Sequence, residues 1–138
     1  MATFNKFNSF VEALSEKAHN LGSDTIKIAL TAAAAAPVAT NTVLANLTEI
    51  AYTNLVSQTV TTTSSAQTSG TYRLILVDKT LTASGGSVGP FRYIALYNDT
   101  AASDELIGWY DYGSDLTLAD GESLTVDFDG TNGVLSLT

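Results

Sequence analysis

The first part of the chain has the apolar spacing of an amphipathic helix. Apolar side chains recur at steps of three and four residues, and charged side chains fall between them. The apolar stripe consists of Phe4, Phe7, Phe10, Val11, Leu14, Ala18 and Leu21. Thr3 is a suitable N-cap, and Gly22 is a suitable residue to end the helix. The pattern therefore predicts one α-helix over residues 4–20.

From about residue 25 the apolar period changes to two, which is the period of a β-strand. Short strand-like segments then follow at intervals of about 8–12 residues, separated by turn signals. We expect a strand at 26–30, a loop with a helical turn near 43–47, a polar turn at 64–70, and further strands at 56–63, 72–78, 92–97 and 106–112. Asp120-Gly121 predicts a hairpin between 117–118 and 123–128, and residues 129–133 predict a second hairpin into 134–137.

This series of short strands predicts the fold class and the number of domains. We expect residues 1–138 to form one domain, which is the usual size for a chain of this length. The expected fold is mainly β: an antiparallel β-sandwich or jelly-roll-like barrel over 25–138, with one N-terminal α-helix. The strand at 72–78 is apolar on both faces, so we expect it to be a central strand.

The charge distribution limits the classes of partner. The chain has 14 acidic and 6 basic residues, a net charge of −8, and no Lys or Arg after Arg92. Nucleic acids and anionic membranes require clusters of Lys and Arg, so neither is expected as a partner. The absence of cysteine excludes disulfides, and the N-terminus lacks the order of a signal peptide. We therefore expect synthesis and folding in a cytoplasm.

Few residues are candidates for catalysis or metal binding. His19 is the only histidine, and a position near a helix end favours a structural role. Asp127–Asn132 resembles the start of a calcium loop but lacks the later Glu, which favours a hairpin turn. A glycosidase pair among Asp104, Glu105, Asp111 and Asp115 would need a fixed separation that the sequence cannot show. We therefore expect no catalytic residues, no cofactor and no metal, and hence not an enzyme.

Aromatic side chains are the stronger candidates for binding. Along 106–112, Trp109 and Asp111 should share one face of the strand, and Tyr110 and Tyr112 the other. One of these faces could bind a sugar or a protein, but core packing on both faces is the favoured interpretation. Exposed Phe rings on a free helix would favour aggregation, so the helix should dock on the sandwich or on a neighbouring subunit. The candidate interface residues are Phe4, Phe7, Phe10, Leu14, Trp109, Tyr110 and Tyr112.

Three blocks of sequence resemble small structural proteins of tailed bacteriophages. They are Phe4–Glu12 leading into Asp24–Thr31, then Gly89–Asp99, then Glu105–Tyr112. The order of the blocks resembles proteins encoded among the head genes, and the similarity covers nearly the whole chain. It implies a virion protein on the capsid exterior, a head decoration or cement protein. Its partners would be the major capsid protein and copies of itself in a β-rich homotrimer.

Two other classes of virion protein remain open from the sequence. One is a receptor- or glycan-binding module of a tail fibre or tail tip, which would use Trp109 or the tyrosines. The other is a tail-tube or head–tail connector subunit, which would assemble into rings.

Overall fold

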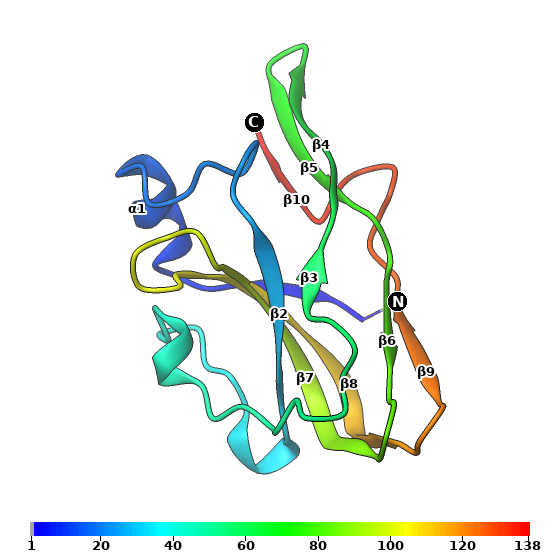
Figure 1. Ribbon diagram of the computed structural model, residues 1–138. Coiled ribbons are helices and arrows are strands. Elements are labelled where there is room, and N and C mark those ends of the chain that lie inside the picture. Colours follow the sequence, from blue (N-terminus) through cyan, green and yellow to red (C-terminus); the bar gives the residue numbers. More distant parts are fainter. Residues whose placement is uncertain (1) are drawn as a thin grey trace.

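The computed structural model describes residues 2–138, and the chain is mainly antiparallel β-structure with one N-terminal helix (Figure 1). Two short 3₁₀ turns, Ala33–Ala35 and Leu44–Asn46, lie in the connection after β2. The helix and the strands are α1 (Phe10–Ser15), β1 (Phe4–Lys6), β2 (Ile26–Thr31), β3 (Thr59–Val60), β4 (Thr62–Thr68), β5 (Thr71–Leu76), β6 (Lys79–Thr82), β7 (Val88–Asn98), β8 (Leu106–Leu118), β9 (Ser123–Val126) and β10 (Leu135–Leu137).

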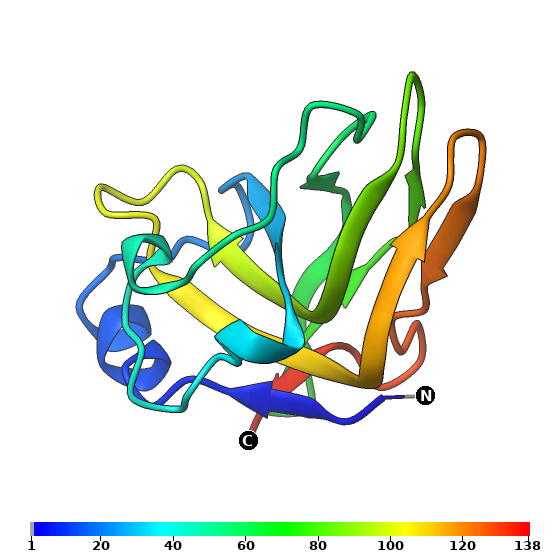
Figure 2. The same cartoon turned by 90° about the horizontal axis from the view of Figure 1, so that it is seen from below.

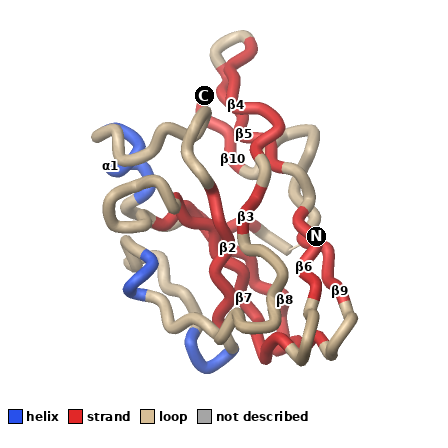
Figure 3. Tube along the Cα trace, in the orientation of Figure 1, coloured by secondary structure: helices blue, strands red, loops and turns tan. Residues whose placement is uncertain are grey.

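The strands form three sheets. The largest has five strands in the order β1-β8-β7-β2-β3, and the others are β10-β5-β4 and β6-β9. Figures 2 and 3 show the five-stranded sheet on one side and the two smaller sheets facing it. The main hydrophobic core contains residues from all three sheets, so it lies between these layers in a sandwich-like arrangement. The predicted fold class is confirmed.

The long strands β7 and β8 form the centre of the large sheet because their side chains alternate between two apolar environments. Ile94 and Leu96 belong to the main core, whereas Ala95 and Tyr97 belong to a second, smaller cluster on the opposite face. Ile94 pairs with Tyr110, and Ala95 pairs with Trp109. Both faces of this sheet are therefore covered by apolar groups, which explains why the strand sequences are almost continuously apolar.

The predicted helix over residues 4–20 is wrong in its bounds. Residues Phe4–Lys6 form β1, which pairs with β8, and α1 is limited to Phe10–Ser15. A spacing of three also suits a strand, since it places residues on opposite faces. Phe4 packs on the main core, and Phe7 packs in the second cluster. Lys17 ends the helical segment with φ of 66°, so Gly22 is not the stop.

Gly108 makes the pairing of β1 with β8 possible. A Cβ at this position would lie 2.6 Å from the Asn5 carbonyl oxygen and would overlap the Phe4 ring. Only glycine leaves space for β1 to cross here, because it has no side chain. Phe4 then packs on Tyr110 with ring centroids 5.2 Å apart.

The predicted turns after residue 118 are present, but the predicted hairpins are not. β9 pairs with β6 instead of β8, and β10 pairs with β5 instead of β9. Turn residues reverse the chain, whereas strand partners depend on where the apolar faces can be buried. The segment predicted as a turn at 64–70 is mostly strand β4, and the turn is limited to Ser69-Gly70. The hairpin of β4 and β5 extends beyond the body at the top of Figure 1.

The strand predicted over 72–78 is only partly central. β5 lies between β10 and β4, and Leu74 and Leu76 are buried, but Ile75 is half-buried and Val77 is exposed. One face of this strand therefore packs on the core and the other faces outward.

None of the helices within residues 2–138 is long and apolar enough to cross a lipid bilayer.

Candidate interaction surface

The outer face of the five-stranded sheet carries the candidate surface. Here a small cluster of Phe7, Ala29, Ala95, Tyr97 and Leu106 is covered by Leu44 and Leu47 from the long connection after β2. Trp109 lies at the rim of this cluster, half-buried, with its ring 4.5 Å from that of Phe7. The cluster itself is buried, and partial exposure on this face remains at Trp109, Leu44 and Leu47.

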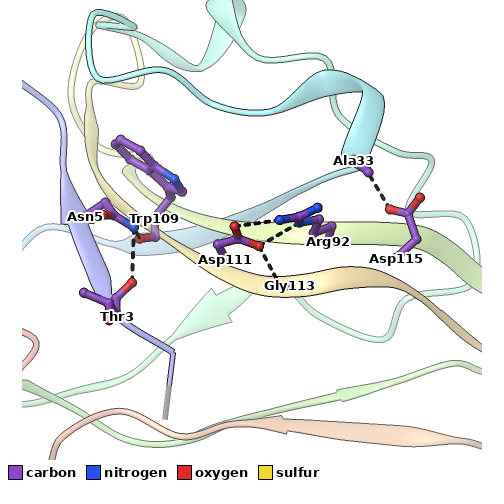
Figure 4. A network of polar contacts seen from close by, with 8 residues as sticks. All are labelled: Thr3, Asn5, Ala33, Arg92, Trp109, Asp111, Gly113 and Asp115. Carbon is purple, nitrogen blue, oxygen red and sulfur yellow. Dashed lines mark hydrogen bonds and ion pairs between the residues drawn. The ribbon is translucent and has the colours of Figure 1, made fainter.

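An ion pair lies beside Trp109 on the same face, as Figure 4 shows. The Arg92 Nε–H donates to Asp111 Oδ1 at 2.7 Å, and Nη2 donates to Oδ2 at 3.0 Å. The Gly113 backbone N–H also donates to Asp111 Oδ1. The hydrogen bonds from Arg92, followed by the one from Gly113, lower the pKa of Asp111. This bidentate geometry fixes the guanidinium in one orientation on the strand surface.

A second carboxylate on β8 holds the neighbouring connection in place. The Ala33 backbone N–H donates to Asp115 Oδ1 at 2.9 Å, and this contact also appears in Figure 4. The edge of β2 is held in the same way, since the Leu30 N–H donates to the Tyr52 hydroxyl and the Gln58 amide donates to the Ile28 carbonyl. These contacts fix the connection that covers the second cluster, so the surface around Trp109 has a defined shape.

The structure separates the predicted interface residues into two groups. Phe7, Phe10 and Tyr110 are at most 5% exposed, so the chain itself uses them as core. Burial also raises the pKa of Tyr110. The residues that keep partial exposure are Phe4, Leu14, Trp109 and Tyr112. Of these, only Trp109 lies on the outer face, because the other three pack against the main core.

His19 does not lie at a helix end as predicted, because α1 ends at Ser15. It lies in the turn that follows α1, is 5% exposed, and packs on Phe10. Its Nδ1 lies 3.1 Å from the side-chain nitrogen of Asn98, which also donates to Asp24. Desolvation by burial lowers the pKa of His19, against the opposing effects of Glu105 and Asp24. This cluster ties the turn after α1 to the end of β7.

Three of the acidic residues considered as metal ligands or catalytic groups hold turns or pairs in this structure. Asp129 Oδ1 accepts hydrogen bonds from the backbone N–H groups of Thr131 and Asn132, which lower its pKa together with the Asn132 side chain. Asp111 is held by Arg92, and Asp115 is held by the Ala33 N–H. Within residues 2–138, no group of three or more His, Asp or Glu side chains could hold a metal ion.

Two polar residues of these clusters were missed by the sequence analysis. The sequence analysis gave Arg92 no functional role, although it is the last basic residue of the chain and precedes a run of acidic residues. Adjacent antiparallel strands at 92–97 and 106–112 would have placed it near Asp111. Asn98 gave no signal, because its role depends on the turn 98–101 and on His19, which are distant in sequence.

Comparison of the chain with family models, with curated proteins and with solved structures finds no match in any of the three.

Proposed function

We propose that this protein is a bacteriophage capsid decoration protein that binds the outside of an assembled head as a homotrimer and reinforces it. The observation that carries the proposal is the location of the sequence blocks that resemble phage head proteins. These blocks contain β1, β2, β7 and most of the paired part of β8. They are therefore four neighbouring strands of one sheet, and β1 and β2 are distant in sequence from β7 and β8. A resemblance that includes four neighbouring strands of the large sheet supports a structural function.

The outer face of this sheet supplies a suitable contact surface. Trp109 and Arg92 belong to the residue types that contribute most to binding energy at protein interfaces. Both are held in place, Trp109 by Phe7 and Arg92 by Asp111, so little conformational entropy would be lost on binding. A standard contact removes about 1,600 Å² of surface in total, and repeated contacts within a trimer add avidity.

The acidic character of the chain supports permanent exposure on a particle. The net charge is −8, and the nine acidic residues after Arg92 are accompanied by no cation. Many of them accept hydrogen bonds from turn N–H groups, as Asp115, Asp120 and Glu122 do. A surface of one sign would keep decorated particles apart in solution.

The test compares particles assembled with and without this protein. On heating, particles lacking it should lose their DNA at a lower temperature than complete particles. When salt is diluted out, they should lose their DNA earlier, at a higher ionic strength than complete particles. Adding the purified protein back should restore the original resistance. Capsids that are equally robust without the protein, but fail to adsorb to host cells, would overturn the proposal in favour of a receptor-binding function.

A variant pair tests the proposed contact surface. Trp109→Ala should weaken binding to bare capsids roughly thirtyfold, the effect of losing about 2 kcal/mol at a central aromatic contact. Val56→Ala is the control, because Val56 is 67% exposed and its segment contacts β6 in the other layer. Equal binding by both variants, with unchanged folding by circular dichroism, would exclude this face as the contact.

A further inference from the structure

The hairpin of β4 and β5 has an open edge along β4. β4 is the last strand of the sheet β10-β5-β4, so no strand within residues 2–138 pairs with its other side. The two strands are joined by Ser69-Gly70, whose φ values of 51° and 84° suit a two-residue hairpin turn. Figure 1 shows the hairpin extending beyond the body, and residues 66–70 at its end are all exposed. This part of β4 is therefore accessible to another molecule.

The pairing register shows which backbone groups of β4 point toward the open edge. Thr68 and Thr71 flank the two-residue turn, so they exchange backbone hydrogen bonds across the hairpin. Bonded and non-bonded pairs alternate along an antiparallel ladder, so the next pair, Gln67 with Tyr72, is not bonded. The N–H and C=O of Gln67 therefore point away from β5. An additional strand would pair with these groups, because a free sheet edge is a template for strand addition.

β4 lacks the features that usually prevent a sheet edge from pairing with another chain. Those features are charged side chains, proline and bulges along the edge. The strand Thr62–Thr68 contains no charged residue and no proline. Its one irregularity lies between Thr62 and Ser64, near the body, and the pairing from Ser64 to Thr68 is regular. The distal part of β4 is therefore a regular strand edge that is free to pair.

The charge distribution favours a second copy of the chain as the partner. Two copies that each carry a net charge of −8 repel one another, so a contact between them should avoid acidic side chains. No acidic residue lies between Glu49 and Asp78, and the hairpin falls within this stretch. Its one charged side chain is Arg73 on β5, which forms no ion pair in the described part of the chain. Contact through the ends of two hairpins would also hold the acidic bodies apart.

We propose that β4 pairs antiparallel with β4 of a second copy of this chain, about a two-fold axis near Gln67. Two identical edges are complementary in this arrangement, because each N–H of one strand meets a C=O of the other. Such a contact is complete with two copies, so on a decorated head it would join subunits of neighbouring trimers and not the subunits within one trimer. It goes beyond the proposed capsid contact and uses neither Trp109 nor Arg92, so either proposal can fail without the other.

The absence of cysteine from the chain allows a direct test by disulfide cross-linking. Directly opposite residues of an antiparallel pair share a face, so a two-fold axis must place one residue of β4 opposite its own copy, with Cα atoms about 4.5–5.5 Å apart. This separation is within the range of a disulfide. The single-cysteine variants are Ser65→Cys, Ala66→Cys, Gln67→Cys and Thr68→Cys. Under mild oxidation, one of them should form a covalent dimer at least tenfold faster than Val56→Cys, the control outside the hairpin at a site that is 67% exposed. Rates no faster than that of the control at all four positions would overturn the proposal.

A variant pair tests whether the contact uses the backbone. Gln67→Pro and Gln67→Ala both remove the hydrogen bond that the Gly70 N–H donates to Gln67 Oε1, but only proline also removes the N–H at the open edge. The hairpin does not use that N–H, so it should tolerate proline there. Gln67→Pro should weaken self-association through this contact roughly tenfold relative to Gln67→Ala, the effect of losing one backbone hydrogen bond from each copy. Sedimentation equilibrium measures the association, and circular dichroism checks the fold. Equal association of two folded variants would contradict the strand pairing.

Discussion

The two faces of the five-stranded sheet are covered in different ways. The inner face packs against the two smaller sheets through large aliphatic side chains and Phe91, most of them fully buried. The outer face has a small cluster that includes two alanines, Ala29 and Ala95, and it is covered by a connection without strands. Hydrogen bonds such as those of Tyr52 and Asp115 hold that connection in place. The comparison indicates that the inner face contributes mainly to stability, whereas the outer face carries the partly exposed groups that could contact a partner.

The largest expected effect comes from a cavity on the inner face. Ile94→Ala should lower the free energy of unfolding by about 2–5 kcal/mol, because Ile94 is fully buried and its truncation removes apolar contacts and leaves a cavity. Leu47→Ala is the matched outer-face variant, and it should cost less because Leu47 is only half-buried. Urea denaturation followed by circular dichroism measures both. Equal losses would contradict the division between the two faces.

The next effect concerns the strand that closes one edge of the sheet. Gly108→Ala places a methyl group against the Phe4 ring and the Asn5 carbonyl oxygen, so β1 must move away from β8. We expect a loss of roughly 1–3 kcal/mol, which is typical of overpacking. Hydrogen exchange should show faster exchange at residues 4–7. Gly130→Ala is the control, since a Cβ there has no atom within 4 Å.

The His19 cluster predicts a smaller, pH-dependent effect. Burial lowers the pKa of folded His19 below its usual 6.5, so the unfolded chain binds a proton more readily. Stability is therefore complete above pH 6.5 and falls as the pH decreases through the interval down to the folded pKa. His19→Gln should remove this part of the pH dependence. Denaturation series between pH 7.5 and 5 would test it, and an unchanged slope in the variant would contradict it.

The smallest expected effect is that of the Arg92–Asp111 pair. Both side chains are about one-third exposed, with relative exposures of 30% and 37%, so solvent and salt screen their attraction. Arg92→Gln and Asp111→Asn should each change the unfolding free energy less than the substitutions above. A double-mutant cycle measures the coupling, which should decrease as salt is added. A coupling that is independent of salt would show that the pair is shielded from solvent.

Much of the fold follows from local patterns in the sequence. The period of two at residues 26–30 and around Trp109 predicts strands whose faces match the observed cores. The N-terminal segment could not be assigned in this way, because Phe4, Phe7 and Phe10 have a spacing that suits a helix as well as a strand with alternating faces. The choice depends on Gly108, which is far away in sequence. The partners of β9 and β10 are equally non-local.

The candidate surface was predicted only in part. Trp109 was among the aromatic residues predicted to bind a partner, and alternation placed it on the same face as Asp111. The ion pair that orients Arg92 could be recognised only from the three-dimensional structure. The same is true of the burial that removes Phe7 and Phe10 from the surface. The role of Asn98 depends on joining its own turn, at Thr100 and Ala101, to a distant segment that contains Ala18, His19 and Asp24, and no local pattern contains this pairing.

The pairing of β1 with β8 has a consequence for the order in which the protein folds. Asn5 contacts a residue 104 positions later in the chain, whereas β7 and β8 are neighbours in sequence and can pair early. During synthesis the first strand leaves the ribosome long before its partner exists. Until then, Phe4 and Phe7 lack the surfaces that bury them. Closure of this edge should be a late event, and the N-terminal aromatic residues should be the part of the nascent chain most exposed to chaperones.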